Sequence, residues 1–299
     1  MKAYRRRTLI LGWAAMLIFS VSALSQSPST IVTEKPHPLL SPGDTQQLVS
    51  KLMARSMPYR IILPTNYKTE EKVKFSVVYL LHGLTGHYTN WTDKTKVADY
   101  AAKHNFIIVT PEGDNGWYTD GVSNPNDKYE SYIMQELIPE IDKNYRTLAD
   151  RDHRVIAGLS MGGYGALKFG LKYADKFSLV GSFSGALGAT SWTVKNAGEI
   201  GKSMDAVFGS DEVSESRKAN DIFRIVRELT PDQQKALPYI YQSCGTEDFL
   251  IANNRDFLKL LNDKKVPHEF REHPGIHDWV FWDDQVREFL DVAERRIKK

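Results

Sequence analysis

The segment RVIAGLSMGGYGALKFG, residues 154–170, is the part of the chain that decides the fold. Residues 154–159 form an apolar run that predicts a strand, and residues 161–173 have the apolar spacing of a helix. Between them, residues 158–162 match the pattern G-x-S-x-G, which places Ser160 on a tight strand-to-helix turn. Chance alone produces this pattern about once in ten chains of this length. The flanking strand and helix favour a nucleophilic serine over an ordinary serine in a glycine-rich turn.

Short β-branched runs alternate with helical stretches on both sides of this segment, which predicts βαβ units around a mostly parallel sheet with helices on both faces. Further strands are predicted at residues 60–63, 76–81, 106–110, 178–182, 239–243 and 268–271, and helices at 94–104, 129–145, 252–264 and 278–296. Residues 187–237 are long, polar and partly helical, and we expect an insertion over one end of the sheet. The sequence therefore predicts one α/β domain over residues 46–299, after a flexible lead-in over residues 26–45.

The first residues have the composition of a targeting segment. Four cations and no acid occur in the first 23 residues, and an apolar stretch over residues 9–24 has small residues near its end. This pattern predicts a secretory signal peptide over residues 1–25, cleaved near Ala23 or Ser25, and hence a periplasmic or secreted protein. An uncleaved membrane anchor is the alternative. After signal removal we expect no stable membrane association.

Composition excludes several classes of protein. The chain has 299 residues, of which 41% are hydrophobic and 25% charged, which excludes a disordered or collagen-like chain. Its single cysteine, Cys244, excludes an intramolecular disulfide framework. Without the first 23 residues the net charge falls from +2 to −2, so the chain lacks the basic surface of a nucleic-acid-binding protein.

A serine nucleophile needs a base within hydrogen-bond reach and an acid that orients that base. After such a turn, the acid and then the histidine follow the serine along the chain. Asp248 follows the predicted strand 239–243, and His277 lies between the last strand and the last helix, so they are the predicted acid and base. Glu247 and His273 are the respective rivals.

Two backbone N–H groups must stabilise the oxyanion of the tetrahedral intermediate. We expect them at Met161, which follows the serine, and at Leu84, in the loop after the strand 76–81. His82, at the start of that loop, is expected to have a structural hydrogen-bonding role. His273 and His277 are four residues apart, but Pro274 and Gly275 break any helix that would align them on a metal. We therefore expect no metal and no cofactor.

Aromatic residues are candidates for substrate binding. Trp117 and Tyr118 follow the strand 106–110 at the end of the sheet where the site should lie, and Trp192 lies in the insertion. Such side chains stack on sugar rings and planar acyl groups, so we expect all three, together with Phe208, to come to the rim of the site. The alternative is that Trp117 packs beneath its own loop.

The motifs together resemble one family of α/β-hydrolases. The matching stretches are LLHGLTG (80–86), GWYTD (116–120), YESYIMQELIPEIDKNYRT (129–147), IAGLSMGGYGALKFG (156–170), SGAL (184–187), CGTED (244–248) and GIHDW (275–279). They resemble the esterase D / antigen 85-like family, also called putative esterases, across nearly the whole chain after the signal peptide. The resemblance implies an α/β-hydrolase fold, with Ser160, Asp248 and His277 as the triad and Leu84 and Met161 as oxyanion donors.

Members of that family act on several kinds of ester. They include feruloyl and acetyl esterases of plant polysaccharides, tributyrin-type esterases, S-formylglutathione hydrolases and mycolyltransferases. Together with the predicted signal peptide, the resemblance therefore implies an exported serine carboxylesterase that hydrolyses short-chain, carbohydrate-linked or hydroxycinnamoyl esters through an acyl-enzyme on Ser160. An acyltransferase with the same triad, an S-formylglutathione hydrolase-like thioesterase and a catalytically inactive binding protein are the alternatives. The sequence leaves the oligomeric state open.

Overall fold

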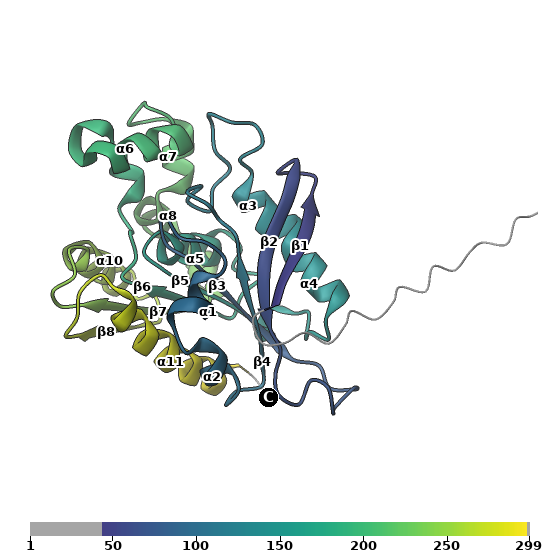
Figure 1. Ribbon diagram of the computed structural model, residues 1–299. Helices are drawn as coiled ribbons and strands as arrows, with labels where there is room; N and C mark the ends of the chain where they lie inside the picture. The colour runs from purple at the N-terminus through teal and green to yellow at the C-terminus, as the bar shows by residue number, and fades with distance from the viewer. Residues whose placement is uncertain (1–43, 298–299) are drawn as a thin grey trace, which may run out of the picture. The chain divides into compact units, whose positions relative to one another are not determined.

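An eight-stranded sheet with the order β1-β2-β4-β3-β5-β6-β7-β8 forms the centre of the fold (Figure 1). The computed structural model describes residues 44–297. Strands β3 to β8 pair in parallel, whereas β1 and β2 form an antiparallel hairpin that joins β4. The strands are β1 (Asp44–Ser50), β2 (Arg55–Ile62), β3 (Ser76–Leu81), β4 (Phe106–Pro111), β5 (Arg154–Leu159), β6 (Leu179–Phe183), β7 (Tyr239–Gly245) and β8 (His268–His273). The prediction of a mostly parallel α/β sheet is confirmed.

Helices cover both faces of the sheet, and each face has its own buried apolar cluster. One face carries α1 (Asn90–Lys94), α2 (Val97–Ala101) and α11 (Trp279–Arg296), and the other carries α3 (Tyr129–Tyr132), α4 (Ile138–Asn144), α5 (Met161–Lys172), α8 (Ile222–Glu228) and α10 (Ile251–Asp263). Successive residues of β3 alternate between the two clusters, Val77 and Tyr79 on one side and Val78 and Leu80 on the other. Burial on both faces explains why these central strands are almost continuously apolar in sequence.

Three predicted boundaries are wrong. Residues 44 and 45 belong to β1 and not to a lead-in, because pairing with β2 orders a strand whose own sequence is polar. The helix expected at 94–104 is reduced to α2, Val97–Ala101, because α1 ends at Lys94, Thr95 is extended and the backbone N–H of Lys96 donates to Asp283 Oδ1 of α11 at 2.7 Å. The strand expected at 60–63 is β2 and begins at Arg55, because pairing with β1 extends it to that residue. The helix expected at 129–145 is confirmed, and it contains a π-helical turn at Ile133–Leu137.

The segment at 187–237 is helical, as expected of an insertion, but only its first two helices lie together at one end of the fold in Figure 1. Its last residues lie at the amino end of β5, where Arg151 donates to the carbonyl oxygens of Ala236 and Leu237. Besides α8 it contains α6 (Val194–Phe208), α7 (Glu215–Asn220) and α9 (Pro231–Ala236). The buried guanidinium of Arg217 holds it together, because its Nη1 donates to the carbonyl oxygens of Thr190 at 2.7 Å and Trp192 at 2.9 Å. The backbone around Trp192 is thereby fixed.

The predicted signal peptide lies outside the described residues, so it remains a prediction. Within residues 44–297, no helix combines the length and hydropathy needed to cross a membrane.

Candidate active site

The turn between β5 and α5 places Ser160 in a strained backbone conformation, with φ 52° and ψ −115°. Glycine is required on both sides of it, because the chain passes close to itself here. A Cβ at Gly162 would lie 2.4 Å from the carbonyl oxygen of Leu81, and one at Gly158 would lie 2.5 Å from the carbonyl carbon of Gly162. The turn therefore presents Ser160 at the amino end of α5, where the helix dipole favours negative charge.

The structure brings the three predicted triad residues together. His277 Nε2 lies 3.0 Å from Ser160 Oγ, and His277 Nδ1 lies 2.8 Å from Asp248 Oδ2. Asp248 is 2% exposed, and its other oxygen accepts the backbone N–H of Leu250 at 2.8 Å. This is the hydrogen-bond order in which an acid orients a base and the base can take a proton from the serine.

Asp248 remains a carboxylate in this environment. Burial alone would raise its pKa, but hydrogen bonds from His277 and from the Leu250 amide lower the pKa below its ordinary value. An acid with a lowered pKa keeps its charge near neutral pH, so it can stabilise an imidazolium on His277.

The two rival residues have other partners. Glu247 accepts the backbone N–H of Gly275 at 2.7 Å, which ties the loop after β7 to the loop after β8. His273 Nε2 lies 3.6 Å from Glu288 of α11. The geometry therefore favours Asp248 and His277 over their neighbours.

The loop after β3 lies directly beside the serine. A Cβ on Gly83 would lie 3.5 Å from Ser160 Cβ, and Leu84 lines the same cavity as Ser160. The backbone N–H groups of Leu84 and Met161 donate no hydrogen bond to another described residue. Both amides are thus available to a substrate oxygen, as an oxyanion hole requires.

His82 and Glu112 brace this loop from beneath. His82 is fully buried, with Nδ1 2.8 Å from the carbonyl oxygen of Gly83 and Nε2 3.1 Å from Glu112 Oε1. Burial alone would raise the pKa of Glu112, but hydrogen bonds from His82 and from the amides of Asp114 and Tyr88 lower it to about 2. The structural role expected of His82 fits these contacts.

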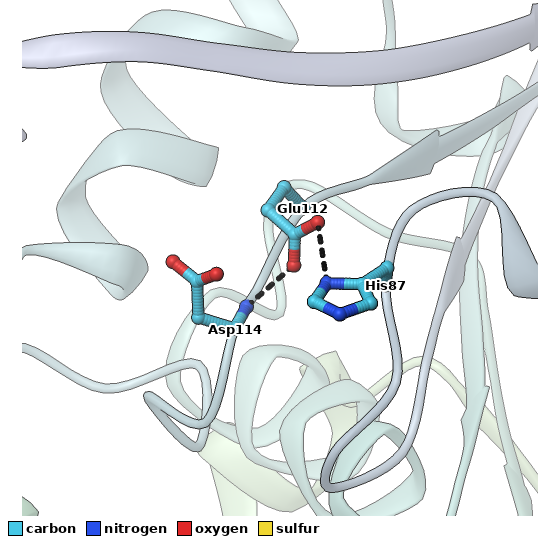
Figure 2. A group of neighbouring side chains, drawn as sticks. All are labelled: His87, Glu112 and Asp114. Atoms are coloured by element: carbon cyan, nitrogen blue, oxygen red, sulfur yellow. Dashed lines mark hydrogen bonds and ion pairs between the residues drawn. The ribbon is translucent and has the colours of Figure 1, made fainter.

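Among the described residues, His87, Glu112 and Asp114 are the one group of ionisable side chains placed closely enough to suggest a metal site (Figure 2). Figure 2 shows Glu112 between the ring of His87, at 3.3 Å, and the backbone nitrogen of Asp114, at 2.7 Å. Asp114 Oδ2 is paired with the guanidinium of Arg55 and accepts the hydroxyl of Tyr129. The carboxylates are already hydrogen-bonded and a cation lies beside them, so the cluster fits a brace between two loops better than a metal site.

A cavity of about 420 Å³ opens over Ser160 and His277 at the carboxyl ends of the parallel strands. Its walls are largely aromatic: Trp117, Trp192, Phe249, Trp279 and Trp282 all line it. The Trp117 and Trp192 rings meet edge to face with centroids 6.0 Å apart. Aromatic walls of this kind suit planar acyl groups and sugar rings.

The prediction that Tyr118 lines the cavity is wrong. Tyr118 is fully buried, and its hydroxyl donates to the carbonyl oxygen of His82 at 2.9 Å, so it supports the oxyanion loop from behind. Phe208 is also fully buried and packs against Tyr164. Trp117 both lines the cavity and packs against its neighbours, with 1% of its surface exposed.

Sequence reasoning missed the side chains that surround the base. Phe249 is 71% exposed, and its ring centroid lies 4.7 Å from that of His277. Trp282 meets the other side of the imidazole edge to face at 4.9 Å. The spacing of Trp279 and Trp282, three residues apart at the start of the helix after His277, was the available signal.

Comparison with known proteins finds similarity to esterases. A family model described as putative esterase matches residues 50–290. The acetyl esterase of Caldicellulosiruptor saccharolyticus is 29% identical over 248 residues, which are 79% of this chain and 92% of that protein. A ferulic acid esterase structure is 29% identical with a TM-score of 0.72, over 84% of this chain and 97% of its own. The structure of S-formylglutathione hydrolase FrmB of Staphylococcus aureus is 25% identical with a TM-score of 0.70, over 84% of this chain and 98% of its own.

The choice of acid can be tested with one pair of variants. Asp248→Asn should lower kcat for p-nitrophenyl acetate by about 10⁴-fold, because an amide can hold the imidazole in the wrong tautomer. Glu247→Gln removes the same charge one residue away and should cost less than about tenfold, because the Glu247 carboxylate accepts from a loop amide whereas Asp248 is the acid that pairs with His277. A severe loss in Glu247→Gln with a mild loss in Asp248→Asn would contradict the assignment.

Proposed function

Because this chain belongs to the putative esterase family and is a carboxylic ester hydrolase, we propose that it hydrolyses short-chain, carbohydrate-linked or hydroxycinnamoyl esters through an acyl-enzyme on Ser160. The observation that carries the proposal is the continuous hydrogen-bond path from Ser160 Oγ through His277 to Asp248. The acid side of this path is buried and the serine side opens into the cavity. A nucleophilic serine requires this arrangement, in which the acid is shielded and the serine is open to the substrate.

The proposed reaction has two halves. His277 Nε2 takes the proton of Ser160 as Oγ bonds to the ester carbon, and the Leu84 and Met161 amides hold the oxyanion. The imidazolium then gives its proton to the leaving alcohol, and the C–O bond breaks to leave the acyl-enzyme. In the second half, water loses a proton to His277 and attacks the acyl carbon; the bond from that carbon to Ser160 Oγ then breaks, and the imidazolium returns its proton to Oγ, which releases the acid and restores Ser160. Asp248 stabilises the imidazolium in both halves.

Two observations support the proposed substrates. The cavity walls are largely aromatic and apolar, with Trp117, Trp192 and Leu250 among them, which suits an acetyl or a planar hydroxycinnamoyl group. Relatives that align with nearly their whole length are named acetyl esterase and ferulic acid esterase. The cavity volume of about 420 Å³ favours small acyl groups over long chains.

The nucleophile and base should behave as one unit. Ser160→Ala should lower kcat by about 10⁴- to 10⁶-fold, because the acyl-enzyme can no longer form, and His277→Ala should be nearly as damaging. The double variant should be hardly worse than either single one. As a control, Ser191→Ala removes a serine outside the cavity and should keep wild-type kcat. Folding is checked by circular dichroism; additive losses, or more than a tenth of the activity in folded Ser160→Ala, would contradict the mechanism.

The acyl group can be tested through Trp192, which is half-buried on the cavity wall. Trp192→Ala should raise KM for methyl ferulate more than for p-nitrophenyl acetate, because an acetyl group is too small to reach this wall.

In wild type, activity across p-nitrophenyl esters should be highest from acetyl to butyryl and fall beyond about eight carbons, since the cavity is short. A preference for palmitoyl esters, or equal KM changes for both substrates, would contradict this pocket.

We also propose that the protein is exported through residues 1–25. The basic start, the apolar stretch and the small residues near Ala23 support this. Amino-terminal sequencing of protein recovered from the periplasm or medium of an expressing bacterium should give a new terminus near residues 24–26. Full-length protein retained in the cytoplasm or the membrane fraction would contradict cleavage and export.

A further inference from the structure

Lys94 places an unpaired cation at the rim of the catalytic cavity. It is the last residue of α1, it is exposed, and it lines the same cavity as Ser160 and His277. Within residues 44–297, no carboxylate lies within ion-pair distance of its ammonium group. Its Nζ instead lies over the ring of Trp279, 5.3 Å from the centroid. A cation held against an aromatic wall remains available to a ligand.

The acids nearest to Lys94 in sequence or in the cavity have other partners. Asp93 is paired with Arg60. Asp278, which also lines the cavity, accepts the backbone N–H of Phe281 at 3.0 Å as the cap of α11. Its charge is offset by the amino end of that helix. The cation of Lys94 is therefore not neutralised by a cavity carboxylate.

A continuous line of ring contacts joins the catalytic base to Lys94. The ring centroids of His277 and Trp282 are 4.9 Å apart, and those of Trp282 and Trp279 are 5.2 Å apart. Lys94 Nζ follows at 5.3 Å from Trp279. Because His277 must protonate the leaving alcohol, this wall is the one that faces the alcohol half of the ester.

The cavity lining carries one cation and one acid. Among the described residues that line it, Lys94 is the one lysine or arginine, and Asp278 is the one acid and already caps α11. Trp282 contributes an apolar surface, because its indole Nε1 has almost no exposed surface and does not reach a ligand in the cavity. A lysine ammonium carries three donors and no acceptor. Its donors and its positive charge together select a ligand group that is rich in acceptors and negatively charged.

We propose that Lys94, held against Trp279, forms a subsite for an anionic leaving group, so that the preferred substrates are esters whose alcohol carries a carboxylate, such as a uronic acid or a hydroxy acid. This inference rests on the proposed ester hydrolysis at Ser160, because it assigns the alcohol half of that reaction. The carboxylate would lie near Lys94 Nζ while the ester carbonyl lies at Ser160. The subsite adds selectivity through charge and hydrogen bonding rather than through the triad itself.

The test uses two acetyl esters that differ in one charge. These are 3-(4-acetoxyphenyl)propanoate and its N-methylamide, which transfer the same acetyl group and leave as similar phenols. The measured quantity is the ratio of kcat/KM for the anionic ester to that for the neutral ester. In wild type this ratio should exceed one and fall with added salt, because salt screens exposed charges. Lys94→Met should lower it about fivefold, and Lys94→Arg should keep most of it.

Lys103→Met is the matched control. Lys103 is also exposed, but it precedes β4 at the amino end of the sheet, away from the cavity. Lys103→Met removes the same charge as Lys94→Met and should leave the ratio of kcat/KM values unchanged. An unchanged ratio in Lys94→Met, or an equal fall in Lys103→Met, would overturn the subsite. Failure of the proposed function would give a different result. Wild type would not hydrolyse the neutral ester, or Ser160→Ala would still hydrolyse it.

Discussion

The strained backbone of Ser160 is the constraint on which the rest of the site depends. A left-handed conformation at a non-glycine residue costs about 1–3 kcal/mol. Hydrogen bonds on both sides hold it, because the Ser160 amide donates to Phe183 at 2.9 Å and the Ser160 carbonyl accepts from Ala186 at 3.0 Å. The close approach of Gly162 to Leu81 then places the loop after β3 beside the nucleophile. One tight crossing of the chain therefore positions the serine, its helix and both candidate oxyanion amides.

The base and acid depend on a second close approach, between the loops after β7 and β8. A Cβ at Gly245 would lie 2.1 Å from the carbonyl oxygen of Gly275, so the two loops touch through glycine backbone. Glu247 accepts the Gly275 amide across the same contact. This contact fixes how far Asp248 and His277 extend above the sheet. Glu247 therefore has a role in geometry although it does not touch the base.

Local patterns predicted the parts of the structure that local forces determine. The central strands were recognisable because burial on both faces demands apolar residues, and Ser160 because its turn demands glycines at 158 and 162. The parts that were missed depend on distant contacts. β1 is ordered by its partner strand, the break at Thr95 is held by Asp283, and Tyr118 is drawn inward by the carbonyl oxygen of His82. No pattern within a single segment encodes these partners.

The two halves of the cavity are built from separate parts of the chain. The wall at Trp192 comes from the insertion that Arg217 holds, whereas the wall at Trp279 and Trp282 comes from α11 with Lys94 of α1 against it. A change in the insertion alters the contacts available to the acyl group without moving α1 or α11, which pack on the other face of the sheet. Selectivity for the acid and for the alcohol can therefore vary independently on one catalytic centre.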